Sequence, residues 1–447
     1  MMNTLVIDER ELVADFKVKN KEQFLCSLDK YEAYIAPVMR ARGYRRVNQT
    51  ERTVLFTFGE ITFSRSRWTN GKRTRVPVDE KLGLKKHTRF SQELLYYVSK
   101  LSTMMTYRQV GIVVETLLGL HITKDTVLKV VKEAGHLLKQ KEKHRNLKPE
   151  VVTTKIQSKY IYIEGDGVLV KCTEEGDERS NRDLTHFVVH TGRKQVAPNR
   201  FELQNKKEII HINYEQARED LLDYLYNHFE ITPETVLITN SDNGKGYSKR
   251  IFSEIGKVLK IQRHEHFWDS YHVNEKSKAM LRPFPEELTS RLFSSIYSHK
   301  KDQTELVLDT CESLIEDEIE LDKFLDFKQK LLRNFSQTKP AVLRGLPGHS
   351  IGIMESQHRK ITYRMKHRGM YWSASGANTM SKMILLERLE DLRDLFFGDW
   401  RGNGETHHLP GMTGGQVKSR LNNKTNHSFE RTEGRIYQKG PVKRFSK

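Results

Sequence analysis

Apolar and polar residues alternate in residues 52–68, RTVLFTFGEITFSRSRW, as they do in strands that bury one face. The apolar positions lie two residues apart in two runs: Val54, Phe56 and Phe58, then Ile61 and Phe63. Gly59-Glu60 separates the runs, so the pattern predicts a β-hairpin, and residues 10–46 before it are predicted to be helical. The far end of the hairpin is basic: Arg65, Arg67, Lys72, Arg73 and Arg75.

A helical spacing follows in residues 107–134. Apolar residues of the first half share one helix face: Val110, Val113, Val114, Leu117 and Leu118. Gly119 is placed to end this helix, and Thr123 is placed to cap a second one. Two helices joined by a tight turn make a helix-turn-helix candidate, and its second helix exposes three lysines: Lys124, Lys129 and Lys132. The alternative is an ordinary helical hairpin with solvated lysines.

The pattern then predicts a linker in residues 137–158, followed by three strands, a helix, a strand, a second helix and a fifth strand. The strands are expected at 159–165, 185–192, 207–214, 235–240 and within KVLKIQRHEHFW. This order predicts an α/β fold, with a mixed five-stranded sheet that has helices on its faces. Further helices are predicted at 284–336, 351–366 and 376–398, before a flexible basic tail.

The composition is strongly basic. The chain has 76 lysine and arginine residues against 58 acidic ones, a net charge of +18 and a pI near 9.5. This surplus favours a polyanionic partner, nucleic acid or an acidic membrane face, over a basic protein without one. No stretch approaches the roughly 18 apolar residues of a membrane helix, and the N-terminus does not resemble a secretory signal. The three cysteines are far apart, so we expect neither a disulfide framework nor a zinc ribbon, and a bacterial-type cytosol is the simplest location.

Two aspartates follow apolar runs that predict buried strands: Asp166 in YIEGDG and Asp242 in VLITNSDNG. Adjacent strands would bring the two carboxylates together, where they repel unless divalent cations neutralise them. A few hard oxygen ligands suit Mg²⁺, with Mn²⁺ as the alternative, and two such ions can serve displacement at phosphorus. Taken singly, each aspartate is better explained as a turn residue, because D-G and D-N-G favour turns.

Glycines beside both aspartates would leave room for a backbone or a metal: Gly165, Gly167, Gly244 and Gly246. A third acid, Glu355, lies near the start of the basic helical segment GIMESQHRKITYRMKHRGMYWS. Arg359 lies at i+4 from it, so the two residues form either a surface ion pair or a metal-binding glutamate beside cations that hold phosphates. Glu164 is predicted to face away and to be a bystander.

Together, YIEGDG, NSDNGKGY, RHEHFWDSYH and the Glu355 segment resemble the ISLre-type transposases of bacterial insertion sequences. That family is a mutator-like branch of the ribonuclease H-like DDE superfamily. The resemblance implies that Asp166, Asp242 and Glu355 are the catalytic residues and hold two Mg²⁺ ions. WDSYH resembles the C/D-x-x-H motif of the branch, which would place Asp269 and His272 near the site; the alternative is a strand end with a satisfied histidine. Tyr247 departs from the pattern, because relatives often carry Trp there.

The resemblance also implies a ribonuclease H-like sheet with a helical insertion, preceded by a mainly α DNA-binding region with the hairpin and the helix-turn-helix. The expected division is a DNA-binding region (1–145), the first part of the catalytic core (155–283), the insertion (284–345), the closing Glu helix (346–398) and the tail (399–447). His358 and Arg359 are candidates for positioning phosphates, and further DNA contacts are expected from the same segment: Arg364, Lys366 and Arg368. Trp372 could stack on an unpaired base, although a core position is expected.

The implied function is a DNA transposase that cuts element ends and joins them to target DNA. The implied partners are double-stranded terminal repeats and target DNA, and a homodimer or larger assembly is expected on the DNA. We expect a nucleoid-associated protein of the bacterial cytoplasm without membrane contact. Two alternatives stay open: a ribonuclease H-like nuclease that does not join strands, and a DNA-binding regulator derived from a transposase.

Overall fold

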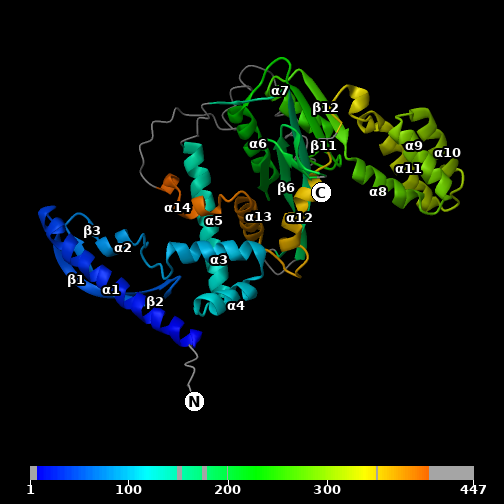
Figure 1. The fold of residues 1–447 in the computed structure, drawn as a ribbon. Helices are drawn as coiled ribbons and strands as arrows, with labels where there is room; N and C mark the ends of the chain where they lie inside the picture. The colour runs from blue at the N-terminus through cyan, green and yellow to red at the C-terminus, as the bar shows by residue number, and fades with distance from the viewer. Residues whose placement is uncertain (1–7, 148–153, 174–178, 199, 349–350, 402–447) are drawn as a thin grey trace, which may run out of the picture. The chain divides into compact units, whose positions relative to one another are not determined.

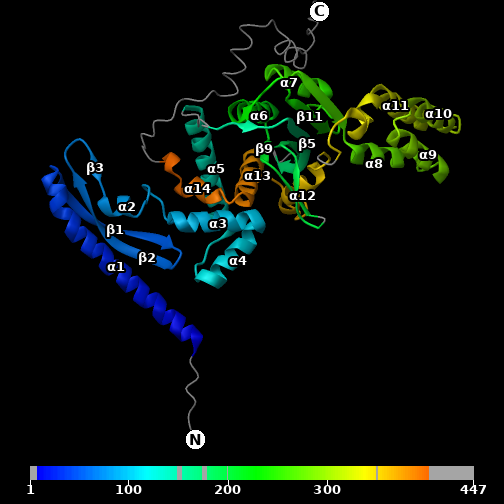
Figure 2. The ribbon, with the colours of Figure 1, turned by 45° about the horizontal axis from the view of Figure 1, so that its top comes forward.

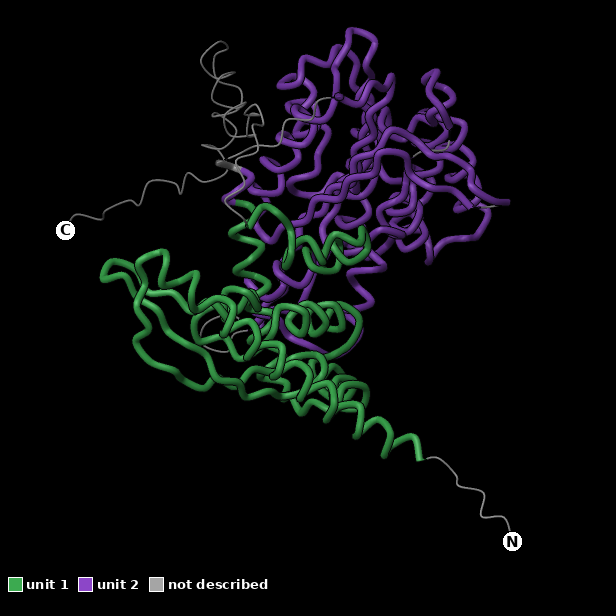
Figure 3. Tube along the Cα trace, turned by 60° about the vertical axis from the view of Figure 1, so that its left-hand side comes forward, with its two compact units in different colours: residues 1–142, 382–404 green, residues 143–381, 405–447 purple. Residues whose placement is uncertain are grey.

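The computed structural model describes most of the chain (Figure 1): residues 8–147, 154–173, 179–198, 200–348 and 351–401. From residue 402 onward, the predicted basic tail lies outside the described residues. The chain divides into two compact units (Figure 3): residues 1–142 with 382–404, and residues 143–381 with 405–447. Among the described helices, none combines the length and the apolar character that crossing a lipid bilayer requires.

The first unit begins with a long helix and a β-hairpin, as the sequence predicts. Its first elements are α1 (Glu9–Ala41), β1 (Arg45–Phe56), β2 (Gly59–Thr69) and the short β3 (Thr74–Arg75). The apolar face of the hairpin is buried against Leu28 of α1: Val54, Phe56, Ile61 and Phe63. Phe56 pairs with Gly59, so the turn is Thr57-Phe58 and not the predicted Gly59-Glu60.

Helices complete this unit: α2 (Pro77–Lys81), α3 (Gln92–Met104), α4 (Tyr107–Leu118), α5 (Lys124–Leu147), α13 (Ala374–Arg388, which continues from the second unit), α14 (Leu392–Phe397) and the 3-10 turn η3 (Asp399–Arg401). Thr106 and Gln109 form a capping box that starts α4, and Gly119 ends it with a φ of 66°. Leu117 is 74% exposed, so the predicted apolar face of α4 is narrower than its spacing indicates. The predicted linker from residue 137 is wrong up to residue 147, because α5 continues through it.

A mixed five-stranded sheet organises the second unit, in the order β12-β11-β5-β6-β9. Its strands are β5 (Tyr160–Thr173), β6 (Arg179–His190), β9 (Lys207–His211), β11 (Val236–Ser241) and β12 (Arg263–Trp268). Strands β5, β11 and β12 are parallel, whereas β6 is antiparallel to both β5 and β9. Two small pairs flank this sheet: β4 (Ile156–Gln157) with β10 (Phe229–Glu230), and β7 (Arg193–Ala197) with β8 (Arg200–Leu203).

The two faces of the sheet are covered by different segments of the chain. Helices α6 (Tyr214–His228) and α7 (Lys249–Val258) pack on the face that carries Ile161, Ile163 and Phe187. The opposite face carries Tyr162 and Val188 and is covered by residues 335–346, with η1 (Phe335–Thr338) and η2 (Val342–Arg344), and by the start of α12 (Met354–Met365). Alternate residues of one strand therefore face two different environments.

A helical bundle lies between β12 and α12 in the chain, as predicted for residues 284–336 (Figure 2). It comprises α8 (Ser270–Leu281), α9 (Glu286–Tyr297), α10 (Lys301–Glu312) and α11 (Glu318–Arg333). Val273 and Leu281 of α8 share one core with the later helices, so the bundle begins before the predicted residue 284. Trp268 and Phe335, at its two ends, belong to the same core and join the bundle to the sheet.

Candidate active site

The register of the sheet brings the two predicted aspartates side by side. Strands β5 and β11 are parallel neighbours, and Asn240 pairs with Glu164 as the last residues of their ladder. Asp242 and Asp166 each follow two residues later, so they lie next to each other where the parallel pairing ends. The predicted strand end at residue 165 is wrong, because β5 continues through Asp166 to Thr173 with β6 as its partner.

Two histidines from different helices face the carboxylate of Asp166. His272 Nε2, from the first turn of α8, lies 3.8 Å from Asp166 Oδ2, and His358 Nδ1, from α12, lies 3.7 Å from the same oxygen. The backbone N–H of Gly167 donates to Asp166 Oδ1 at 2.7 Å. Burial acts to raise the pKa of Asp166, but these neighbours outweigh it and lower that pKa below its usual value. Helices α8 and α12 thus both reach the carboxylate of Asp166.

The two histidines differ in charge. The Asp166 carboxylate, acting against partial burial, raises the pKa of His272 to about 9. Burial, together with the neighbouring His186, lowers the pKa of His358 to about 4. At neutral pH, the site therefore presents a cationic His272 and a neutral His358 to one aspartate.

A second layer of polar contacts ties α12 to the sheet behind His358. The His358 ring stacks on that of His186, with centroids 5.3 Å apart. His186 Nε2 lies 3.2 Å from Glu208 Oε2 on β9, and Lys360 of α12 forms an ion pair with Glu208. Burial acts to raise the pKa of Glu208, but His186 and Lys360 lower it well below its usual range. These contacts hold α12 across β6 and β9.

The glycines beside Asp166 do not clear space for a metal, contrary to the sequence-based interpretation. They face the other side of β5 from Asp166, since side chains alternate along a strand. A Cβ on Gly165 would lie 2.8 Å from the Phe187 ring, and one on Gly167 would lie 2.2 Å from Asp183 Oδ1. The lack of a side chain at Gly165 therefore makes room for the Phe187 ring, and the lack of one at Gly167 makes room for Asp183. Asp183 is an acid that no sequence motif indicates.

Asp183 remains partly open to solvent on strand β6. Partial burial, then the charges of Asp166 and Asp242, raise the pKa of Asp183. No motif in the sequence marked this residue. Only the pairing of β5 with β6 brings it beside Gly167.

Asp242 lies in a tight turn between β11 and α7. Its Oδ1 accepts the N–H of Gly244 at 2.7 Å, and its carbonyl oxygen accepts Trp268 Nε1 at 3.1 Å. Asp269 caps α8, accepting the N–H of Tyr271 at 2.9 Å, and its own N–H donates to Ser241 O at 2.7 Å. Asp269 therefore starts the helix that carries His272 directly beside the end of β11.

Glu355 is exposed on the first turn of α12, one turn before His358. Among the described residues, no ion pair or hydrogen bond joins Glu355 to Arg359, which is also exposed. Within the described part of the chain, no three His, Cys, Asp or Glu side chains are grouped closely enough to hold a metal ion. The carboxylates of Asp166, Asp242 and Glu355 are nevertheless the type of ligand that Mg²⁺ takes, because that ion binds a few carboxylate oxygens and keeps several waters.

Glu164 is not the outward-facing bystander that the sequence analysis expects. Its side chain is fully buried on the same face of β5 as Asp166. Its Oε2 accepts three hydrogen bonds of 3.0 Å each, from the Asn240 side chain and from the backbone N–H groups of Gly352 and Ile353. The alternation along YIYIEGD could have placed Glu164 on this face, but its partners are about 75 and 190 residues away.

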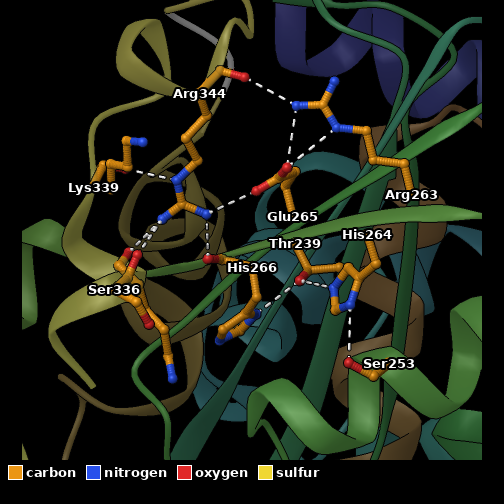
Figure 4. Close-up of polar contacts among 10 residues, drawn as sticks. Thr239, Ser253, Arg263, His264, Glu265, His266, Ser336, Lys339 and Arg344 are labelled. Atoms are coloured by element: carbon orange, nitrogen blue, oxygen red, sulfur yellow. Dashed lines mark hydrogen bonds and ion pairs between the residues drawn. The ribbon is translucent and has the colours of Figure 1, made fainter. Parts of the chain in front are cut away.

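Arg344 lies in the segment between the helical bundle and α12, and it attaches that segment to strand β12 (Figure 4). Its guanidinium lies 3.9 Å from the centre of the Phe267 ring and 3.3 Å from Glu265 Oε2. It donates to four backbone carbonyls, those of Ser336, Gln337, Lys339 and His266. Arg344 is therefore almost fully satisfied by hydrogen bonds within the fold.

Polar side chains of β12 contact Thr239 of β11 and Ser253 of α7 (Figure 4), and a further contact, which the figure does not draw, reaches the Asp242 turn. Thr239 Oγ1 lies 2.8 Å from His264 Nε2 and 2.7 Å from His266 Nδ1. His266 Nε2 lies 3.1 Å from the side-chain oxygen of Asn243, the residue after Asp242. Burial, followed by nearby positive groups, lowers the pKa of His266 to about 3, so this ring is neutral at physiological pH.

The predicted DNA contacts differ in exposure. Arg364 is 1% exposed, its guanidinium lies 5.2 Å from the Trp372 ring centre, and Trp372 itself is buried, so both are core residues. Arg65 is half-buried and lies 3.3 Å from Asp79. Arg368 is half-buried beside Tyr363, and Arg359 is solvent-exposed. The other candidates are also exposed: Arg67, Lys72, Arg73, Lys124, Lys129, Lys132 and Lys366.

Comparisons with known proteins give a family, and they include a distant structural likeness. A family model described as "Uncharacterised protein family (UPF0236)" matches residues 5–392, and the chain therefore belongs to that family. A relative from Streptococcus gallolyticus, described as "UPF0236 protein in vanSb 3'region", is 30% identical over 386 residues, which are 85% of this chain and 77% of the relative. A chain of the "Drosophila P element transposase strand transfer complex" aligns over 93% of its length and 77% of this chain, at 12% identity and a TM-score of 0.23. A TM-score this low does not establish a shared fold.

Proposed function

We propose that this UPF0236 protein is a DDE-type DNA transposase of an insertion sequence, with a ribonuclease H-like catalytic core. One observation carries the proposal: parallel strands β5 and β11 set Asp166 and Asp242 side by side, and His358 of the Glu355 helix contacts Asp166. The element order of the sheet, three strands, a helix, a strand, a helix and a strand, supports the same core.

In this proposal, Asp166, Asp242 and Glu355 hold two Mg²⁺ ions, which Mn²⁺ can replace. Held by these carboxylates, the ions would supply activation of an attacking oxygen and stabilisation of a leaving oxygen on phosphorus. His272 Nε2 and His358 Nδ1 approach the same oxygen of Asp166, at 3.8 and 3.7 Å, so both rings are proposed to orient that carboxylate. Asp269 positions His272 by capping α8.

DNA is the proposed substrate, in the form of the element's terminal repeats and of the target duplex. The net charge of +18 supports a polyanionic partner, and the exposed lysines of α5 lie on the second helix of the helix-turn-helix candidate. Joining two element ends requires an assembly that pairs them, so we propose that the protein acts on DNA as a homodimer or a larger assembly.

The test is incubation of the pure protein with Mg²⁺ and DNA that carries candidate terminal repeats. Products in which an element end is joined to target DNA are the expected result. Nicks without joined products would instead indicate the nuclease that shares this core. Retention of DNA without any cleavage would indicate a regulator and would contradict the proposal.

A further inference from the structure

We propose that Glu164 is a positioning residue, which fixes the Glu355 helix against the two aspartate-bearing strands. This inference rests on the proposed function, because it assigns Glu164 a role in the geometry of the three proposed catalytic acids. Glu164 is fully buried, and its Oε2 is the shared acceptor of three donors from two other segments. We refer to Glu164, Asn240, Gly352 and Ile353 as the Glu164 cluster.

The Glu164 cluster includes residues from all three segments that carry a proposed catalytic acid. In each segment, a cluster residue lies two positions before that acid. Glu164 and Asn240 each lie two residues before an aspartate, Asp166 and Asp242. Ile353, the N-cap of α12, lies two residues before Glu355. One carboxylate oxygen therefore joins β5, β11 and the start of α12 just before their proposed catalytic residues.

The bonds to α12 determine where that helix begins. Gly352 adopts a φ of 81°, a conformation that favours glycine, and its N–H and that of Ile353 both point at Glu164 Oε2. These two amides precede the helix, so its own hydrogen bonds do not replace them. Without Glu164, two backbone donors at the start of α12 would lose their acceptor, and leaving the buried N–H of Ile353 unpaired is unfavourable.

Glu164 is not itself suited to hold a metal ion. A carboxylate oxygen has about two lone-pair sites, and three donors already occupy those of Oε2. The other oxygen, Oε1, is enclosed within the described fold without a hydrogen-bond partner, 4.0 Å from His190 Nε2, and the His190 ring stacks on Tyr162 at 4.8 Å. The residue therefore acts through the segments that it joins.

The geometry also separates two variants. In Glu164→Gln, the amide oxygen can take the place of Oε2 and accept the same three bonds. In Glu164→Ala, all three donors lose their acceptor. The matched control is Glu254→Ala, since Glu254 is another buried acid, 3.2 Å from Arg218, on the opposite face of the sheet.

The experiment combines Mg²⁺-dependent cleavage with hydrogen exchange of the metal-free full-length protein. Glu164→Ala should slow cleavage by roughly 100-fold, the cost of a small misplacement of reacting groups, and raise the Mg²⁺ concentration for half-maximal rate without changing DNA affinity. The amides of Gly352 and Ile353 should exchange at least about tenfold faster in this variant. Glu164→Gln should preserve most of the rate and the protection of both amides.

Two results would overturn the inference. One is a Glu164→Ala variant that matches Glu254→Ala in cleavage rate and in exchange at residues 352–353. The other is a Glu164→Gln variant as impaired as Glu164→Ala, since hydrogen-bond acceptance would then not be the role. If the unsubstituted protein does not cleave DNA, the proposed function fails, and the exchange measurement alone still decides whether Glu164 holds the start of α12.

Discussion

Two buried side chains of opposite type attach the same return segment, residues 335–353, to one sheet. Arg344 donates to carbonyls of that segment and of edge strand β12, whereas Glu164, on central strand β5, accepts from the segment and from β11. Each is almost completely enclosed, and each gathers several partners on one functional group. The two attachments differ in how close their partners lie, along the chain, to the proposed catalytic acids.

No partner of Arg344 lies within two residues of a proposed catalytic acid. The partners of Glu164, in contrast, lie two or three residues before Asp242 or Glu355. Loss of either attachment leaves buried groups unpaired, which destabilises the fold. Only loss of the Glu164 attachment also releases the start of α12 from the aspartates. We therefore expect the Arg344 contacts to serve stability alone, and the Glu164 contacts to serve stability together with the geometry of the proposed site.

A large effect is expected at Glu355, the acid that the Glu164 cluster is proposed to position. Glu355→Gln should slow Mg²⁺-dependent cleavage by about a thousandfold or more, exceeding the effect of Glu164→Ala, because it removes a ligand rather than its support. Glu286→Gln, at an exposed acid in the first turn of α9, is the matched control and should retain most of the rate. A Glu355→Gln variant that cleaves like the control would contradict the assignment of the third acid.

Removal of Arg344 should mainly cost stability. Arg344→Ala removes the donor to Glu265 Oε2 and to several carbonyls, although Arg263 still donates to Glu265 Oε1, so we expect the free energy of unfolding to fall by about 2 kcal/mol. Urea unfolding measures this loss, and the folded fraction should cleave DNA at a rate close to that of the unsubstituted protein. If folded Arg344→Ala molecules lost most of their cleavage rate, the contacts of Arg344 would also support the active site, and the proposed difference from Glu164 would be wrong.

His266, whose carbonyl accepts a hydrogen bond from Arg344, makes the stability of the fold depend on pH. The folded pKa of His266 is about 3, below its usual value of 6.5, so only the unfolded chain binds a proton at that ring as pH falls below 6.5. Stability is therefore lost on acidification, by about 2 kcal/mol at pH 5 from this residue. Urea unfolding at pH 7.5 and 5.0 measures the effect, which His266→Gln should reduce. An equal pH dependence in both proteins would rule out this contribution.

The smallest effect is expected at the exposed lysines of α5, remote in the chain from both clusters. Lys129→Gln should weaken DNA binding modestly and reduce the slope of log K against log salt by about 1, as loss of one phosphate contact does. Leu128→Ala, at a neighbouring exposed apolar residue, is the control. Titrations at several salt concentrations test this, and an unchanged slope would remove Lys129 from the DNA-contacting surface.

The sheet and the hairpin could be predicted from the sequence, because the alternating or helical spacing of apolar residues indicates which positions are buried. The adjacency of Asp166 and Asp242 followed from the same reasoning and agrees with the register of β5 and β11. The assignment of catalytic and metal-binding roles to these aspartates and to Glu355 stays a prediction. The interpretation of Gly165 and Gly167 was wrong, because alternation along β5 turns them away from Asp166.

Contacts between distant segments could not be predicted. The expectation that Glu164 faces away is wrong, and its partners, Asn240 and the amides of Gly352 and Ile353, are defined only by the fold. Arg364 was grouped with exposed cations, although helical spacing turns it toward Trp372. Asp183 carried no motif at all. Spacing along a sequence specifies which face a residue occupies, but not which distant segment covers that face.

The central claim is that Asp166 belongs to the chemistry of DNA cleavage and joining. It is tested most directly by assaying the unsubstituted protein and Asp166→Asn with Mg²⁺ on DNA that carries the element ends, with binding to the same DNA measured in parallel. We predict that Asp166→Asn binds the ends with unchanged affinity but yields neither cut nor joined products. An Asp166→Asn protein that cuts and joins DNA normally would contradict the account.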